Sequence, residues 1–176
     1  EESSFLNPTK VVRLAGIHEG MQVADFGAGS GDYSFPLLDR LKGEGSVYAF
    51  DFLPGVVESL QRESARRNRE NFFALCVDLN RHIPLKDSLL HCAVLANTLH
   101  AIDERQIFLS ELHRVLRASG FVLYVDWAAS FHNIGPTTER VLPPGEAARL
   151  FRSEGFQVGS MLPAGSHHYA FIATKV

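Results

Sequence analysis

The stretch VADFGAGSGDYS, residues 23–34, places glycine at every second position from Gly27 to Gly31, and an acidic residue, Asp25, comes just before them. The apolar residues that lead into the stretch predict a short buried strand, and the residues that follow it predict a helix. An ordinary turn between a strand and a helix seldom needs three alternating glycines, but a backbone that closely approaches a ligand does. We therefore interpret this stretch as a ligand-binding loop at the end of the first strand.

Strand-like and helix-like segments alternate around this loop. Regular alternation predicts a parallel sheet with helices on both faces, and two successive strands joined by a short loop predict an antiparallel pair at the C-terminus. We expect one domain, residues 1–176, with an α/β, doubly wound, Rossmann-like, mostly parallel seven-stranded sheet. The expected strands are 21–26, 46–51, 71–77, 89–96, 119–126, 156–161 and 168–175, and the expected helices are 8–15, 32–41, 54–68, 103–117 and 144–154.

Composition and charge exclude several classes of partner. The net charge is −3, and the basic run of Arg62, Arg66, Arg67 and Arg69 has helical spacing with glutamates between, which is typical of a solvated helix face; we therefore expect no nucleic-acid partner. No apolar stretch approaches the roughly 20 residues of a membrane span, and no signal-peptide pattern opens the chain. The two cysteines, at positions 76 and 92, lie in apolar runs, where we expect small buried side chains and a reducing, cytoplasmic setting.

The glycine loop can be compared with the known phosphate-binding patterns. A P-loop requires Gly-Lys-Ser or Gly-Lys-Thr, and this loop contains no lysine. The dinucleotide pattern requires Gly or Ala at a third position that Asp32 or Ser34 occupies here, depending on which glycine begins the count. Asp32 at the start of a helix would also repel a phosphate. The loop therefore indicates a ligand other than a phosphate, which disfavours an NAD-type oxidoreductase.

The segment DFGAGSG, residues 25–31, resembles the acidic, glycine-rich loop of class I S-adenosylmethionine-dependent methyltransferases. Two further segments, 83–103 and 109–127, are similar to the fourth strand, the following helix and the fifth strand of the subgroup that includes ubiquinone/menaquinone-biosynthesis methyltransferases. Where that family usually reads Lys-Pro-Gly-Gly before the fifth strand, this chain has Arg-Ala-Ser-Gly at 117–120, and we expect Gly120 to preserve the turn.

The resemblance implies S-adenosylmethionine as the cofactor and assigns it a set of binding residues at successive strand ends. The glycines would pass beneath its methionine part, with Asp25 near the ammonium group and the carbonyl of Asn97 beside it. Asp51 would accept hydrogen bonds from the ribose hydroxyls. The adenine would contact Phe52, Asp78 and Leu79. The expected cofactor residues are thus Asp25, Gly27, Gly29, Gly31, Asp51, Phe52, Asp78, Leu79 and Asn97.

The methyl acceptor is expected beyond the ends of the fourth and fifth strands, partly beneath an irregular segment at 128–142. The sequence lacks the Asn/Asp-Pro-Pro-aromatic pattern of nucleic-acid amino-methyltransferases, so we expect a small-molecule acceptor. No pair of histidines has the spacing of a metal motif, so no metal is expected. Candidate catalytic residues are His100, Asp126 and His132, and candidate acceptor-binding residues are Trp127, Phe131, His168 and Tyr169.

Methyl transfer needs mainly alignment of donor and acceptor and exclusion of water, so a dedicated base is optional. A cofactor-binding module without catalysis, acting as a regulatory or partner subunit, remains an alternative to an enzyme. The sequence leaves open the acceptor, the accepting atom, the oligomeric state and whether residues precede Glu1.

Overall fold

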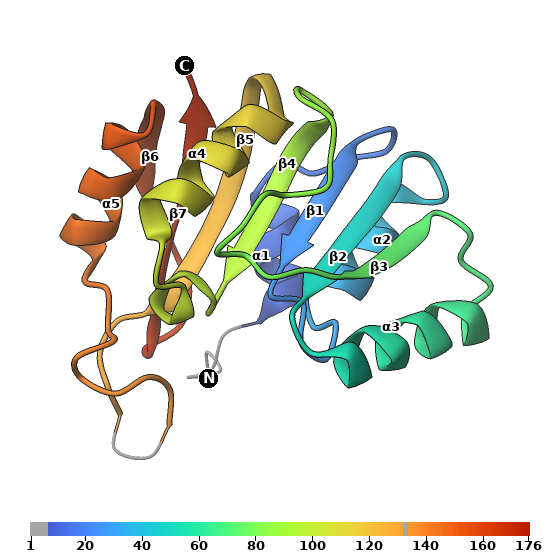
Figure 1. Ribbon diagram of the computed structural model, residues 1–176, viewed down its shortest axis with the longest axis horizontal. Helices are drawn as coiled ribbons and strands as arrows, with labels where there is room; N and C mark the ends of the chain where they lie inside the picture. The colour runs from blue at the N-terminus through green and yellow to red at the C-terminus, as the bar shows by residue number, and fades with distance from the viewer. Residues whose placement is uncertain (1–6, 132–133) are drawn as a thin grey trace.

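The computed structural model describes residues 7–131 and 134–176, which fold around a seven-stranded sheet (Figure 1). Every element predicted from the sequence is present, with bounds that differ by at most three residues. The strands are β1 (Gln22–Phe26), β2 (Ser46–Asp51), β3 (Phe72–Cys76), β4 (Leu90–Ala96), β5 (Leu116–Trp127), β6 (Phe156–Leu162) and β7 (His168–Lys175). The helices are α1 (Pro8–Leu14), α2 (Ser34–Leu41), α3 (Pro54–Arg66), the 3-10 turn η1 (Leu99–Ala101), α4 (Arg105–Val115) and α5 (Pro144–Ser153).

The strand order, β3-β2-β1-β4-β5-β7-β6, confirms the predicted doubly wound sheet. Strands β1 to β5 pair in parallel, whereas β7 is antiparallel to both β5 and β6. The chain moves outward in one direction from β1 to β3 and in the other direction from β4 onward. The order therefore reverses between β1 and β4, and in sheets of this kind ligands bind beyond the carboxyl ends of the strands at such a point.

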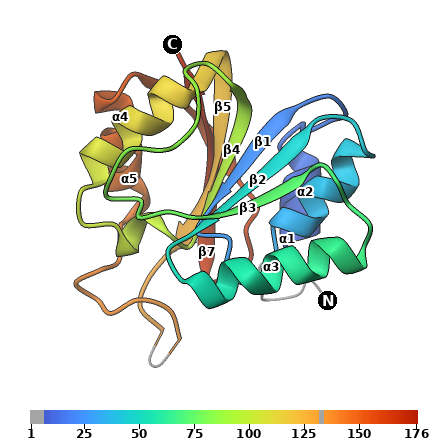
Figure 2. The ribbon, with the colours of Figure 1, turned by 45° about the vertical axis from the view of Figure 1, so that its right-hand side comes forward.

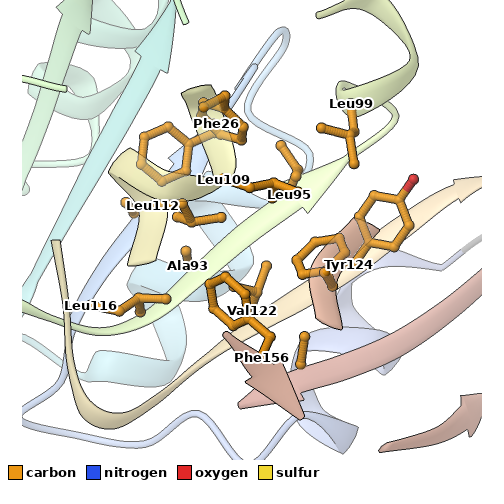
Figure 3. Close-up of a cluster of buried hydrophobic side chains, with 14 of the residues drawn as sticks. Phe26, Ala93, Leu95, Leu99, Leu109, Leu112, Leu116, Val122, Tyr124 and Phe156 are labelled. Carbon is orange, nitrogen blue, oxygen red and sulfur yellow. The ribbon is translucent and has the colours of Figure 1, made fainter. Parts of the chain in front are cut away.

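Helices cover both faces of the sheet, as Figure 2 shows: α1, α2 and α3 lie on one side, and α4 and α5 lie on the other. Two apolar cores fill the space between the helices and the sheet. The core beneath α4 and α5 is drawn in Figure 3, where Leu109 and Leu112 of α4 meet Ala93 and Leu95 of β4. The core on the opposite face contains Val12 of α1 and the apolar residues of α2.

The carboxyl ends of the parallel strands and the segment between β5 and α5 lie at the same edge of the sheet. The carboxyl ends of the parallel strands lie at the lower edge in Figure 1, and the segment that joins β5 to α5 projects from the same edge. In its described part this segment contains only an isolated bridge between Phe131 and Ile134. None of the helices in the described residues is long and apolar enough to cross a membrane.

The structure corrects two expectations about individual side chains. Cys92 is buried as predicted, but Cys76 is exposed, because it is the last residue of an edge strand. Ser119 and Gly120, expected in a turn before the fifth strand, lie within β5, and the left-handed backbone falls on Ser119 (φ 60°) and not on Gly120. Gly120 serves packing instead, since a Cβ there would come within 2.9 Å of the Arg117 carbonyl oxygen.

The basic run on α3 and the residues after it has the surface role that its spacing predicted. Arg66 and Arg67 both form ion pairs with Glu63, and Arg62 pairs with Glu58. The guanidinium carbon of Arg67 also lies 4.2 Å from the centre of the Phe35 ring. The charges of this helix are therefore largely compensated on the helix itself.

Candidate active site

The glycine loop folds back from the end of β1 onto β2. The backbone N–H groups of Gly27 and Ala28 donate hydrogen bonds to the Phe50 carbonyl at 2.8 and 2.9 Å. Gly27, Gly29 and Gly31 all have positive φ angles, which side chains disfavour. The close path of the loop thus needs glycine for its backbone conformation.

Each glycine also has its own packing environment. A Cβ on Gly27 would overlap the side chain of Thr98, and a Cβ on Gly31 would overlap Phe35 and Leu60. A Cβ on Gly29 would meet nothing within 4 Å. Gly31 therefore seats the loop against α2 and α3, whereas Gly29 borders open space that a ligand can use.

Asp51, at the end of β2, fastens this loop. Its Oδ2 accepts a hydrogen bond from the Gly29 N–H at 3.0 Å, and its Oδ1 accepts one from the Leu53 N–H at 3.1 Å. The residue is only 8% exposed. Because a carboxylate offers about four acceptor positions, each oxygen keeps capacity for a further donor. Asp51 is thus placed to accept two hydroxyl groups.

A pocket with a volume of about 430 Å³ opens beside Gly29 and Asp51. This volume falls within the range of small-molecule sites. Seven of the nine expected cofactor residues, at the ends of four strands, line this pocket: Gly27, Gly29, Asp51, Phe52, Asp78, Leu79 and Asn97. Six further residues complete its wall: Leu53, Val56, Asn80, Thr98, Ala101 and Ile102.

The charge of this pocket is informative about its ligand. Its wall carries the carboxylates of Asp51 and Asp78 and the amides of Asn80 and Asn97, and none of these lining residues is Lys or Arg. Phosphate groups are usually bound by basic side chains or by free helix N-termini. The described wall therefore suits an uncharged or cationic ligand better than a phosphate.

Asp78, after β3, is held in place by its neighbours. Its Oδ1 accepts hydrogen bonds from both the backbone N–H and the side-chain amide of Asn80, and these bonds lower the pKa of the carboxyl below its ordinary value. The Oδ1 of Asn80 in turn accepts the backbone N–H groups of Asp103 and Glu104, each at 3.1 Å. Asn80 thus ties the loop after β3 to the turn before α4, across one end of the pocket.

Asn97 and Thr98, after β4, form the wall opposite Asp51. Asn97 has a φ of 54°, a left-handed conformation that asparagine tolerates better than most residues, and its N–H donates to the Val125 carbonyl at 2.9 Å. The Thr98 hydroxyl donates to the Ala96 carbonyl at 2.9 Å, and its side chain lies against Gly27. The end of β4 and the glycine loop therefore support each other at the switch point of the sheet.

Asp25 and Gly31 are the two expected cofactor residues that do not line this pocket. Asp25 is 2% exposed, and its Oδ2 accepts a hydrogen bond from the Ser34 hydroxyl at 2.6 Å. Burial raises the pKa of its carboxyl to about 7, although the bonds from Ser34 oppose the shift. Asp25 thus lies beneath the loop and braces the start of α2.

Two of the candidate catalytic residues, His100 and Asp126, lie in direct contact. The His100 Nδ1 lies 2.7 Å from the Asp126 Oδ1, and the Asp126 side chain is 1% exposed. The Tyr124 hydroxyl donates to the other carboxylate oxygen at 2.9 Å, and the Tyr169 hydroxyl donates to the Leu142 carbonyl at 2.6 Å. Figure 3 shows the Tyr124 hydroxyl directed away from the apolar core.

The other candidate acceptor residues form a separate aromatic group. Trp127 lies with its ring centre 4.3 Å from that of His168 and 6.3 Å from that of Phe131. Because side chains alternate along a strand, Trp127 faces the side of the sheet opposite to Asp126. Tyr169 likewise belongs to the Asp126 side and not to this group. His132 lies outside the described residues.

Sequence analysis missed six residues of the pocket wall, above all Asn80 and Thr98. Asn80 and Thr98 each directly follow an expected cofactor residue, Leu79 and Asn97, at the same strand end. Position at the carboxyl end of a parallel strand is therefore the signal that could have found them. Their specific partners, the turn at 103–104 and Gly27, come from distant parts of the chain.

Comparison with known proteins identifies the family. A family model described as a methyltransferase domain matches residues 23–120, which is more than half of the chain and includes the glycine loop and β1 to β4. The chain belongs to this methyltransferase-domain family. The match ends at Gly120, within β5.

Proteins similar to this methyltransferase-domain chain include two named as methyltransferases and one uncharacterized protein. It is 29% identical to a crystal structure of a SAM-dependent methyltransferase from Aquifex aeolicus, with a TM-score of 0.90 over 98% of this chain and 92% of that one. It is 25% identical over 118 residues to the ubiquinone/menaquinone biosynthesis C-methyltransferase UbiE of Geobacter sp. (strain M21), covering 66% of this chain and 50% of that protein. An uncharacterized protein of Mycobacterium bovis, Mb1440c, is 28% identical over 159 residues, covering 85% of this chain and 55% of that protein.

These findings confirm the predicted family, the fold and S-adenosylmethionine as the cofactor. The chain spans about half the length of the curated relatives that it matches. The roles of the individual site residues remain predictions, for which the pocket geometry provides the physical basis.

Proposed function

We propose that this methyltransferase-domain protein transfers the methyl group of S-adenosylmethionine to a small-molecule acceptor. The single observation that carries the proposal is the position of Asp51, a nearly buried carboxylate on the pocket wall with a free acceptor position on each oxygen. A ribose offers two adjacent hydroxyl donors, and the absence of Lys and Arg from the described pocket wall suits a ligand without phosphates.

The residues of the pocket divide the cofactor between them in this proposal. Asp51 accepts the ribose hydroxyls, Phe52 and Leu79 pack against the adenine, and Asp78 accepts its amino group. The methionine part lies along Gly27 and Gly29, toward Asn97 at the switch point. Bound in this way, the cofactor supplies a methyl group activated by a sulfonium, so the protein must mainly align the acceptor and exclude water.

Two observations, one on the surface charge and one on a relative, support a small acceptor. First, the arginines of α3 and of the residue after it pair with glutamates, so this basic run does not provide the uncompensated positive surface that a nucleic acid requires. The curated relatives include an enzyme named for ubiquinone and menaquinone biosynthesis, which concerns small molecules. The acceptor is expected to bind beside Asn97, over the ends of β4 and β5.

The test combines binding and turnover. Calorimetry with S-adenosylhomocysteine should show binding to the purified chain, and NAD should not bind. A screen of small molecules with methyl-labelled S-adenosylmethionine should then reveal transfer. Binding without transfer to any acceptor would favour a non-catalytic cofactor-binding module, and the absence of binding would overturn the proposal.

A further inference from the structure

In the hydrogen bond between His100 and Asp126, the donor can be assigned from the surrounding contacts. Three donors converge on the Asp126 carboxylate: the His100 Nδ1, the Tyr124 hydroxyl and the backbone N–H of Trp127, at 2.7, 2.9 and 2.9 Å. An ionised carboxylate can only accept, so Nδ1 of His100 carries its proton. In the neutral imidazole, Nε2 is then a hydrogen-bond acceptor.

The Nε2 atom of His100 is available to accept a hydrogen bond, whereas Nδ1 is bonded to Asp126. Within residues 7–131 and 134–176 it has no hydrogen-bond partner, and it is not fully buried. The His100 side chain as a whole is 15% exposed. The backbone that carries it is fixed, since the Arg105 guanidinium donates to the carbonyls of Leu99 and His100 at 3.2 and 3.3 Å. An accessible basic nitrogen is thus held on a rigid turn.

His100 lies next to the cofactor pocket but is not one of the residues that line it. His100 lies within η1, and its neighbours Thr98, Ala101 and Ile102 line the pocket. Its side chain turns the other way, toward the end of β5, where Asp126 lies. His100 therefore stands between the cofactor pocket and the region in which the acceptor is expected.

We infer that His100 is the catalytic base of this protein, positioned by Asp126, and that the acceptor carries its nucleophile as a hydroxyl or N–H group. This inference rests on the proposed function. A thiolate, or another nucleophile that is ionised in water, would need no such base. The chemical class of the acceptor thus follows from the presence of the dyad.

The chemical step balances with these groups alone. The O–H or N–H bond of the acceptor breaks, and its proton goes to Nε2 of His100, while Asp126 stabilises the imidazolium. The electron pair of the acceptor atom forms the new bond to the methyl carbon, and the carbon–sulfur bond breaks with its pair left on sulfur. The proton passes from His100 to solvent after the product leaves.

The first test compares matched acceptors in His100→Gln, with His18→Gln as the control. His18 is exposed, and its Nδ1 lies 2.9 Å from the Glu19 carbonyl oxygen. Phenols and thiophenols of the same ring substitution have similar shapes, but the thiophenols are ionised at neutral pH. His100→Gln should lower transfer to phenols by roughly 100-fold or more and should change transfer to thiophenols little. His18→Gln should leave both unchanged.

The second test needs no turnover. The complex with S-adenosylhomocysteine is titrated with 4-nitrophenol below the pH at which this phenol ionises in water, and the visible absorbance of its phenolate is followed. The wild-type complex should develop the phenolate band, whereas His100→Gln should not. Asp126→Asn should weaken the band and should lower kcat more than it changes KM, because Asp126 acts through His100.

The outcomes separate this inference from the proposed function. Failure of the wild-type chain to bind S-adenosylhomocysteine would overturn both. If it binds, equal losses with phenols and thiophenols in His100→Gln would show a structural role for His100 and overturn the inference. The same holds if the wild type transfers methyl groups only to thiols, if no hydroxyl or N–H compound accepts one, or if the phenolate band persists in His100→Gln.

Discussion

The carboxylate of Asp51 accepts a hydrogen bond from the backbone N–H of Gly29 at 3.0 Å, which joins the end of β2 to the middle of the glycine loop. The acidic residue assigned to the ribose therefore also fixes the loop assigned to the methionine part. Because the Leu53 N–H occupies the other carboxylate oxygen, the orientation of the Asp51 side chain is set before a ligand arrives. Such preorganisation reduces the entropic cost of binding.

Asp51→Ala is expected to weaken S-adenosylhomocysteine binding by about 1–3 kcal/mol, because it leaves polar partners unpaired. Asp51→Asn should lose less, since its amide oxygen can still accept one hydrogen bond. Calorimetry measures both, with Asp39→Ala as the control for loss of a surface carboxylate that pairs with Arg69. Wild-type affinity in Asp51→Ala would show that the ribose assignment is wrong.

Gly27→Ala and Gly29→Val should affect different properties. Both positions have positive φ, which costs a side chain about 1–2 kcal/mol, but only a Cβ at Gly27 overlaps Thr98. Gly27→Ala should therefore lower the free energy of unfolding, measured by urea denaturation, by more than that amount. Gly29→Val should mainly reduce affinity for S-adenosylhomocysteine, because its side chain enters the open space of the pocket. The same loss of stability in Gly43→Ala, where nothing lies near, would contradict the overlap argument.

Asp25 should make the ligand-free protein less stable as the pH rises from about 4 to about 7. Burial raises the pKa of its carboxyl from 3.8 to about 7, so the folded state binds more protons than the unfolded state across this range. The free energy of unfolding then falls with rising pH, by an amount on the order of a few kcal/mol. Urea denaturation at several pH values should show this slope in the wild type and a smaller one in Asp25→Asn. Parallel pH profiles for the two proteins would contradict the assignment.

The sequence predicted those parts of the site that depend on local position. Asp51, Asp78 and Asn97 each end or follow a strand, and in a parallel sheet these ends meet at one edge. The role of Asn80 could not be predicted, because its acceptor oxygen serves backbone groups 23 and 24 residues further along the chain. The sequence could not place the overlap of Gly27 with Thr98 for the same reason.

Other differences arise from the sheet as a whole. Cys76 was expected to be buried, but its exposure depends on β3 being an edge strand, which requires the strand order. Asp126 and Trp127 are adjacent in sequence, yet the alternation of side chains along β5 sends them to opposite faces. The expected acceptor residues therefore divide into a polar group around His100 and an aromatic group around Trp127.

The aromatic group provides the last prediction, through His168. Both ring nitrogens of His168 are buried without a hydrogen-bond partner among the described residues, and burial lowers the pKa of the ring, so it is neutral at pH 7. Each unpaired nitrogen costs stability, in general about 1–3 kcal/mol for a buried polar group. His168→Phe should keep the ring contact with Trp127 and should not lower the free energy of unfolding, while kcat/KM for an identified acceptor falls and S-adenosylhomocysteine affinity stays unchanged. Trp127→Ala serves as the comparison, because it should reduce both stability and kcat/KM. If both variants turned over normally, the aromatic group of Trp127 and His168 would lie outside the acceptor site.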